Sequence, residues 1–434
     1  MLNAGRGDIL VEMGGYMRTD WVKKKIREIG KVQTGSTPKT SERGNFGNYV
    51  PFIKPSDFFK NGSLEYENQG LSEVGLKQSR LVDKESVLMV CIGATIGKVG
   101  FTEKNVTTNQ QINSLTPLNG DCAKFLFYQM LTQDFQQKVL SSAGQATLPI
   151  INKTKWSNLS LYLPSLLEQK RIVSIVDQAF EGIDGAIAHT KKNLTNAREL
   201  FESYRNSVLT QEGRQWEETT LGAEIDLMTG FPFKSNRYTE SDRSIRLLRG
   251  DNIIQGSLRW DDVKKWSESE IDEFLTYQLQ EGDVVLAMDR PWVKAGLKHA
   301  MISQNDLPCL LVQRTACLRG TKNISNRFLM YLIGSHAFIR HILSNQTGIG
   351  VPHISGKQIQ SFRFLRPTLS EQNFISNNLD ELSSKNQRLE AIYQQKLDAL
   401  TELKQSILQK AFTGELTADI ANQTTKKAEE AIAA

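Results

Sequence analysis

The sequence contains few cysteines and few prolines, and it has no long apolar run. Four cysteines and 11 prolines occur among 434 residues, and no two cysteines have C-x-x-C spacing. These counts argue against a disulfide-stapled secreted domain and a cysteine-based zinc site, so we expect free thiols in a reducing compartment. There is no stretch of about 18 apolar residues that could cross a membrane, and residues 1–20 do not have the pattern of a secretory signal peptide. The sequence therefore indicates a cytoplasmic protein.

A large excess of charge of one sign is also missing. The 53 Lys and Arg residues against 48 Asp and Glu residues give a net charge of +5, which permits nucleic-acid binding but does not require it. With 39% hydrophobic and 23% charged residues, the composition excludes a disordered chain. At roughly 150 residues per domain, the length corresponds to two or three domains with buried cores.

Recognisable catalytic motifs are missing as well. The sequence has no G-x-G-x-x-G, Walker or H-E-x-x-H motif, and its five histidines lie in no triad-like or metal-ligating setting. Residues 288–292 (MDRPW) are similar to the D-P-P-[YFW] loop of DNA amino-methyltransferases, but Arg290 replaces the first proline and no glycine-rich S-adenosylmethionine loop accompanies it. We therefore predict no catalytic residue and no metal ligand. A stand-alone DNA methyltransferase or nuclease with unrecognised motifs remains an alternative, as does a coiled-coil scaffold protein.

What the sequence does contain is an internal repeat. Residues 124–177 align with residues 327–380 without a gap, and 14 of these 54 positions are identical, where average composition gives roughly three. The starts of the two halves also correspond, at a shift of 195 instead of 203, so the second half carries insertions. The matched residues include Trp21 with Trp216, Gly35 with Gly230, Tyr128 with Tyr331, Pro164 with Pro367, Gln169 with Gln372, and Asp177 with Asp380.

Each half combines a mixed globular part with a long helix. Short β-like runs at residues 87–92, 284–287 and 309–312 are bounded by turn residues, and helical stretches follow them, so we predict an α+β fold for each globular part. The expected divisions are an N-terminal extension without an assigned role (1–20), a first globular domain (21–164), a first long helix (165–212), a second globular domain (213–367), a second long helix (368–412) and a C-terminal tail (413–434).

The two long helices are predicted from caps and heptads. Ser165 with Glu168 and Thr368 with Glu371 have the spacing of a capping box, and no proline follows for over 40 residues. Apolar residues then recur every seven, so we favour an antiparallel coiled coil of roughly 60 Å over two helices that each pack on their own domain. The predicted helix-pairing and partner-contacting residues are Leu166, Ile172, Val176, Ile183, Leu200, Leu369, Ile375, Leu379, Leu389, Leu400 and Leu403.

Side chains that suit DNA recur at corresponding places in the two halves. Arg and Lys match the guanine edge or phosphates, and Asn and Gln match the adenine edge. For each of them an ordinary solvated side chain is the alternative. The predicted DNA-binding residues are Lys54, Asn109, Gln110, Gln111, Gln145, Thr147, Lys153, Arg249, Asn252, Arg290, Trp292, Gln313 and Arg314.

The openings of the two helices carry a resemblance. LPSLLEQKRIVSIVD and LRPTLSEQNFISNNLD each place a proline before a helix with Glu-Gln and then Ile and Asp, and AFTGELTAD follows at residues 411–419. In this doubled arrangement the chain resembles the specificity subunit of type I restriction–modification enzymes, from about Trp21 to Asp419.

The resemblance implies that each globular part is a target recognition domain for one half of a split, asymmetric DNA site. It implies that the helices pair antiparallel, set the distance between the half-sites and bind two modification subunits, one for each half. S-adenosylmethionine, ATP and magnesium are then expected on the modification and restriction subunits, and no cofactor is expected on this chain.

Overall fold

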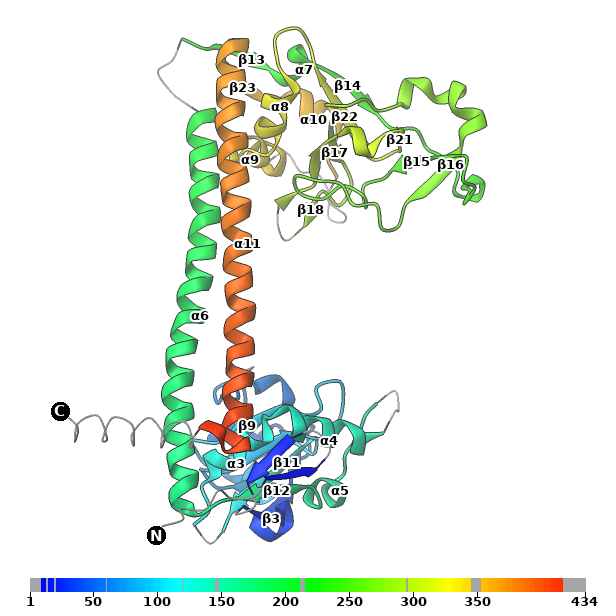
Figure 1. The fold of residues 1–434 in the computed structure, drawn as a ribbon. Helices are drawn as coiled ribbons and strands as arrows, with labels where there is room; N and C mark the ends of the chain where they lie inside the picture. The colour runs from blue at the N-terminus through cyan, green and yellow to red at the C-terminus, as the bar shows by residue number, and fades with distance from the viewer. Residues whose placement is uncertain are drawn as a thin grey trace, which may run out of the picture. The chain divides into compact units, whose positions relative to one another are not determined.

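The structure is a computed structural model, and it describes residues 9–12, 15–18, 21–59, 61–118, 120–144, 148–210, 215–293, 296–344 and 353–416. The chain forms two compact units, Met1–Lys191 with Gln395–Ala434 and Lys192–Gln394. Each unit holds one globular part and a portion of both long helices, α6 (Leu166–Leu209) and α11 (Leu369–Thr413) (Figure 1).

The first globular part is built on a four-stranded antiparallel sheet in the order β4-β11-β8-β9. A second sheet, β6-β5-β10-β7, contains the parallel pair β5 and β10. The elements are β3 (Val22–Lys25), α1 (Ile26–Ile29), β4 (Gly30–Thr34), β5 (Phe46–Ile53), β6 (Gly70–Leu71), α2 (Glu73–Lys77), β7 (Leu81–Val82), β8 (Val87–Val90), β9 (Val99–Phe101), β10 (Val106–Thr108), β11 (Ile112–Pro117), α3 (Ala123–Met130), α4 (Gln133–Ala143), α5 (Lys153–Ser157) and β12 (Ser160–Leu163). Ahead of them, β1 (Ile9–Glu12) and β2 (Gly15–Arg18) form an antiparallel pair.

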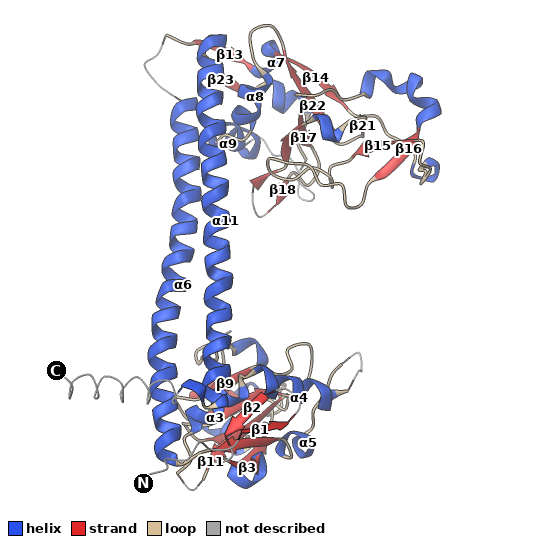
Figure 2. Cartoon of the chain, in the orientation of Figure 1, coloured by secondary structure: helices blue, strands red, loops and turns tan. Residues whose placement is uncertain are grey.

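The second globular part repeats the four-stranded order as β14-β22-β17-β20, and its second sheet, β16-β15-β21, has three strands and contains the parallel pair β15 and β21. The mixed helix-and-strand fold predicted for each half is confirmed, and Figure 2 shows helices and strands together in both globular parts. The elements are β13 (Glu217–Thr220), α7 (Leu221–Glu224), β14 (Ile225–Thr229), β15 (Ser244–Leu248), β16 (Lys264–Ser267), the 3-10 helix η4 (Glu268–Tyr277), β17 (Val284–Ala287), β18 (Trp292–Val293), β19 (Gly296–Leu297), β20 (His299–Met301), β21 (Cys309–Leu311), β22 (Thr315–Gly320), α8 (Asn326–Ile333), α9 (His336–Ser344), α10 (Gly356–Gln360) and β23 (Arg363–Arg366).

The central strands are buried on both faces, which explains their unbroken apolar sequences. In β8, Val87 and Met89 join the core that contains α3, whereas Leu88 and Val90 face a second core on the opposite side. Successive strand residues point to opposite faces, so a strand covered on both sides is apolar throughout. The equivalent strand β17 divides its side chains between two cores in the same way.

The helical stretches of the globular parts are each split in two. Residues 124–142 form α3 and α4, because the Thr132 hydroxyl accepts a hydrogen bond from the Phe135 N–H and starts a new helix. In the second unit, Ser335 Oγ accepts the Phe338 N–H in the corresponding place. Ser and Thr are favoured at helix starts for this reason.

The long helices run antiparallel within each unit. In the first unit, Lys404 Nζ lies 2.5 Å from Asp184 Oδ1, and in the second, Arg198 Nη2 lies 2.7 Å from Glu390 Oε2. At the start of α11, the Thr368 N–H donates to the Glu371 carboxylate and the Glu371 N–H donates to the Thr368 hydroxyl. The predicted capping box is therefore present there.

The predicted helix-pairing and partner-contacting residues divide into buried and exposed positions. Leu379, Leu400, Val176 and Ile183 are buried or half-buried, as predicted. Heptad spacing permits the alternating position to follow after three or four residues. Four residues after Leu379 and Leu400, Ser383 and Lys404 are half-buried, whereas Leu403, three residues after Leu400, is exposed. Among the remaining predicted residues, Ile172 and Ile375 are buried, whereas Leu166, Leu200, Leu369, Leu389 and Leu403 are exposed by 39%, 69%, 45%, 37% and 46%.

Residues that are identical in the two halves form hydrogen bonds between each long helix and its globular part. The buried Gln169 donates to the Pro164 carbonyl and accepts the Cys122 N–H, and Gln372 makes the same bonds to the Pro367 carbonyl and the Ser325 N–H. Buried polar groups need such partners, which explains why these residues recur.

A second repeated contact joins a tyrosine hydroxyl to a carboxylate. Tyr128 donates to Asp177, and Tyr331 donates to Asp380 at 2.6 Å. Burial raises the pKa of both tyrosines well above the usual value, and the neighbouring carboxylates raise it further. Both hydroxyls therefore stay protonated donors.

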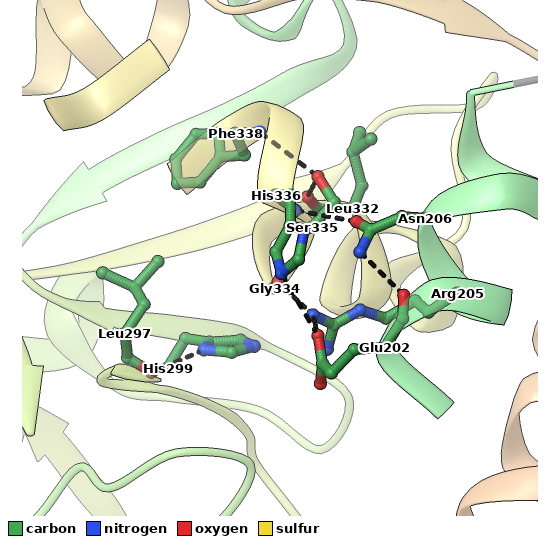
Figure 3. A network of polar contacts seen from close by, with 10 residues as sticks. All are labelled: Glu202, Arg205, Asn206, Leu297, His299, Leu332, Gly334, Ser335, His336 and Phe338. Atoms are coloured by element: carbon green, nitrogen blue, oxygen red, sulfur yellow. Dashed lines mark hydrogen bonds and ion pairs between the residues drawn. The ribbon is translucent and has the colours of Figure 1, made fainter. Parts of the chain in front are cut away.

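The C-terminal end of α6 is bound to the second globular part through a buried arginine (Figure 3). Arg205 donates to the Gly334 carbonyl at 2.6 Å and to Glu202, and Asn206 accepts the His336 N–H at 2.8 Å. His299 lies beneath this contact and donates from Nδ1 to the Leu297 carbonyl at 2.9 Å.

His299 is expected to make the second unit acid-sensitive. The pKa of His299 is lowered to about 4, mainly by burial and also by the positive charge of Arg205, while the hydrogen bond to the Leu297 carbonyl raises it in part. Because the folded pKa lies below the unfolded value of about 6.5, the neutral ring stabilises the fold above pH 6.5. We expect about 3 kcal/mol of this stability to be lost as the pH falls from 6.5 to 4. The free energy of unfolding of His299→Gln, measured between pH 6.5 and 4, should lack this loss, whereas a variant of the exposed His189, His189→Gln, should show the same loss as the wild type. Equal pH slopes for the wild type and His299→Gln would contradict the assignment.

No helix in the described part of the chain is long and apolar enough to cross a membrane. The four cysteines are free, with Cys91, Cys309 and Cys317 buried and Cys122 half-buried. Burial raises the pKa of Cys91 and of Cys309 to about 12. The three buried thiols belong to hydrophobic cores.

Candidate nucleic-acid interface

Two of the predicted DNA-binding segments occupy equivalent turns. Residues 109–111 connect the parallel strand β10 to β11, and residues 312–314 connect β21 to β22. Gln110 and Gln313 are exposed at the same point of the two turns, and Gln111 corresponds to Arg314. The repeat therefore presents related but different side chains from the same framework.

In the first unit, the turn is held by its own amides. Asn109 donates from Nδ2 to Gln111 Oε1 at 2.9 Å and accepts the Gln111 N–H at 3.1 Å. Gln110 accepts a hydrogen bond from the Thr37 hydroxyl at 2.6 Å. Asn109 thus shapes the turn, while Gln110 is its most exposed side chain.

In the second unit, a carboxylate that sequence reasoning missed lies beside the turn. Arg314 Nη1 is 3.1 Å from Asp289 Oδ2, and His353 Nδ1 contacts the other oxygen of Asp289. Arg290 is exposed on the next residue of the same loop. The predicted Arg290, Gln313 and Arg314 are therefore brought to one place, although they lie far apart in sequence.

A neighbouring loop carries Arg249, and it corrects one prediction. Asn252 is only 3% exposed; it accepts the Arg249 N–H and donates to the Arg259 carbonyl. It closes the loop and does not face solvent, so a direct contact with a base is not its role in this conformation. Arg249 is half-buried and pairs with Asp251 at 3.3 Å.

Sequence reasoning also missed a lysine at an equivalent place in each half. The Val90 N–H donates to the Lys98 carbonyl in the first unit, and the Ala287 N–H donates to the Lys298 carbonyl in the second. Burial lowers the pKa of Lys298, and the charges of Arg259 and Arg290 lower it further, whereas Asp251 raises it. The side chains of Arg259, Arg290 and Lys298 therefore lie near one another, with Asp251 beside them. The sequence could have indicated both lysines, since Lys98 directly precedes β9 and Lys298 directly precedes β20, the strands that pair with β8 and β17.

The remaining predicted residues are more scattered. Lys54 is half-buried and donates from Nζ to Gln69 Oε1 at 2.8 Å, and Lys153 is exposed at the start of α5. Trp292 is half-buried against the core of the second unit. Gln145 and Thr147 lie outside the described residues.

Within the part of the chain that the structure describes, no group of three or more His, Cys, Asp or Glu side chains could hold a metal ion.

Comparison with known proteins assigns the chain to a family. The model of the type I restriction modification DNA specificity domain matches residues 18–196 and 215–407. The specificity subunit of the type I restriction enzyme EcoAI of Escherichia coli is 41% identical over 168 residues, which are 38% of this chain and 28% of that subunit. The MjaVIII specificity subunit of Methanocaldococcus jannaschii is 23% identical over 92% of this chain and 93% of its own length.

Solved structures have the same fold. A chain from a type I restriction–modification system, 16% identical, superimposes with a TM-score of 0.75 over 91% of this chain and 98% of its own. The HsdS subunit of Thermoanaerobacter tengcongensis, also 16% identical, superimposes with a TM-score of 0.55 over 93% of this chain and 100% of its own. With its two matched domains and its repeated topology, the chain belongs to the type I restriction modification DNA specificity family.

Proposed function

We propose that this chain reads the DNA target of a type I restriction–modification enzyme, with each globular part reading one half of a split site. The observation that carries the proposal is the pair of equivalent turns, which present Gln110 and Gln111 in one unit and Gln313 and Arg314 in the other. Different side chains on the same framework recognise different bases, so the full target is asymmetric.

The chain itself carries out no chemistry in this proposal. Modification subunits bound to it methylate adenine, and restriction subunits cleave the DNA, so S-adenosylmethionine, ATP and magnesium belong to those partners. The naming of the relatives as specificity subunits supports this division. The assembly acts on double-stranded DNA in the cytoplasm, and its modification subunits number two.

The test uses the chain with its modification subunits and a DNA library in which two short half-sites and the gap between them are randomised. Sequencing of the methylated molecules is expected to return one asymmetric, two-part motif. The chain alone, with labelled S-adenosylmethionine, is expected to transfer no methyl groups. Methyl transfer by the chain alone would support a stand-alone methyltransferase, and methylation without sequence preference would refute the recognition role.

A further inference from the structure

The Arg314 turn differs from its counterpart by more than one residue. In both units the backbone around the turn makes the same three contacts. The Cys91 N–H donates to the Gln111 carbonyl, as the Met288 N–H does to the Arg314 carbonyl, and the Ile151 N–H donates to the Cys91 carbonyl, as the Ile354 N–H does to the Met288 carbonyl. The β-bridge between Ile92 and Ile150 corresponds to the β-bridge between Asp289 and His353. The framework is therefore the same. An isoleucine pair in the first unit stands where the second unit has an acid and a histidine.

These two side chains act on the exposed arginine. One carboxylate oxygen of Asp289 lies 3.1 Å from Arg314 Nη1, and the other contacts His353 Nδ1. The side chain of Asp289 is 24% exposed and that of Arg314 is 70% exposed. The ion pair restricts the orientation of an otherwise exposed guanidinium. Because the planar group has more N–H donors than this one contact uses, donors remain for a further partner.

The backbone is held in an uncommon conformation at the same place. Arg314 has φ +66° and Arg290 has φ +45°, and only one other non-glycine residue in the described chain, Glu85, has a positive φ. In the first unit, Gly93 occupies the position of Arg290, with φ +101°. Residues other than glycine rarely adopt a positive φ, because the strained backbone must be held by the surrounding structure, and such residues cluster at functional sites.

We propose that Arg314 reads a guanine in the major groove of the second half-site, and that Asp289 and His353 are positioning residues that orient its guanidinium. The inference rests on the function proposed above. An arginine that donates two parallel hydrogen bonds to guanine O6 and N7 needs a fixed orientation, whereas a phosphate contact does not. Pairing with Asp289 also reduces the net positive charge of the site, which would weaken a contact made only to phosphate.

The test compares base preference at each position of the second half-site, with the first half-site kept constant. The full chain is used with its modification subunits, and methylated library molecules are sequenced. For the wild type we expect one position with a strong preference for guanine. Arg314→Gln is expected to reduce that preference roughly 5- to 150-fold and to leave the other positions unchanged. The preference at the first half-site reports that the complex is folded and assembled.

A second set of variants separates positioning from general affinity. Asp289→Asn keeps the shape of the side chain but removes its charge, so it should lower the guanine preference without weakening total binding; His353→Gln should do so to a smaller extent. Arg314→Lys keeps the positive charge but lacks the planar fork, and it is expected to lose the same preference. The exposed Arg363→Gln in β23 changes the charge equally and serves as the matched control.

Two results would be decisive against the idea. If Arg314→Gln and Arg314→Lys both keep the guanine preference, Arg314 does not contact the base. If Arg314→Gln weakens binding to all sequences equally and reduces the slope of log affinity against log salt concentration by about one, Arg314 contacts a phosphate. If the wild-type complex shows no two-part motif at all, the proposed function fails instead, and the two failures are distinguishable.

Discussion

Replacing Arg319 with threonine is expected to destabilise the second unit by about 3–5 kcal/mol. The Asp283 side chain is only 2% exposed, and Arg319 binds both of its oxygens, at 2.6 Å from Nε and 2.8 Å from Nη2. Removal of the arginine leaves a buried carboxylate without its counter-charge. The loss should appear as a lower midpoint in denaturant unfolding of the full chain.

The internal repeat supplies the matched rescue. The positions of Asp283 and Arg319 correspond to Ser86 and Thr116 in the first unit, whose hydroxyls lie 2.8 Å apart. The double variant Asp283→Ser with Arg319→Thr transplants this neutral pair, so we expect it to recover most of the lost stability. The exposed pair of Arg363 and Glu218, 3.7 Å apart, provides the control, since Arg363→Thr should cost less than about 1 kcal/mol. A double variant no more stable than Arg319→Thr would show that the two pairs are not interchangeable.

Gly230→Ala is expected to remove the base preference at the second half-site. A Cβ atom at this position would lie 2.1 Å from the Val312 carbonyl oxygen and 2.3 Å from its carbon. Backbone atoms cannot give way as the end of a flexible side chain can, so the turn that carries Gln313 and Arg314 has to move. Because recognition tolerates little displacement of a base-reading group, the library experiment should show a flat preference over the second half-site.

Two glycine variants control for this result. Gly35→Ala makes the equivalent clash with the Asn109 carbonyl oxygen at 2.2 Å, and it should affect the first half-site only. Gly182→Ala lies in α6 with nothing within 4 Å of the added carbon, and it should leave recognition intact and stabilise the helix by about 0.5–1 kcal/mol. Retention of the second half-site preference by Gly230→Ala would argue that the 312–314 turn does not contact DNA.

The residues that matched between the halves predicted the parts of the fold that recur. Gln169 and Gln372 connect the helix starts to the globular parts, and Gly35 and Gly230 lie against the two turns. Such positions tolerate few alternatives, because each lies directly against backbone atoms, so they remained identical in both copies. This is why self-comparison of one sequence was enough to establish two copies of one α+β domain, each followed by a long helix.

The candidate site was only partly visible. The exposed turn residues were predicted because their side chains suit base edges, but Asn252, of equally suitable type, is buried and closes a loop. Residue type alone does not distinguish these cases, because exposure depends on how distant segments pack. Asp289 and His353 were missed for the same reason: 64 residues separate them, and the pairing of their backbones brings them together.

The sequence by itself determined the duplication, the fold class of each half, the long helices and the family to which the chain belongs. Only the tertiary structure decided which step of the heptad is buried, so that Leu389 and Leu403 are exposed on α11 while Leu379 packs in the core. It also decided which charges meet at the Arg314 turn. The physical reason is the same in both cases: periodicity and residue type are local properties, whereas burial and orientation depend on contacts between segments far apart in the chain.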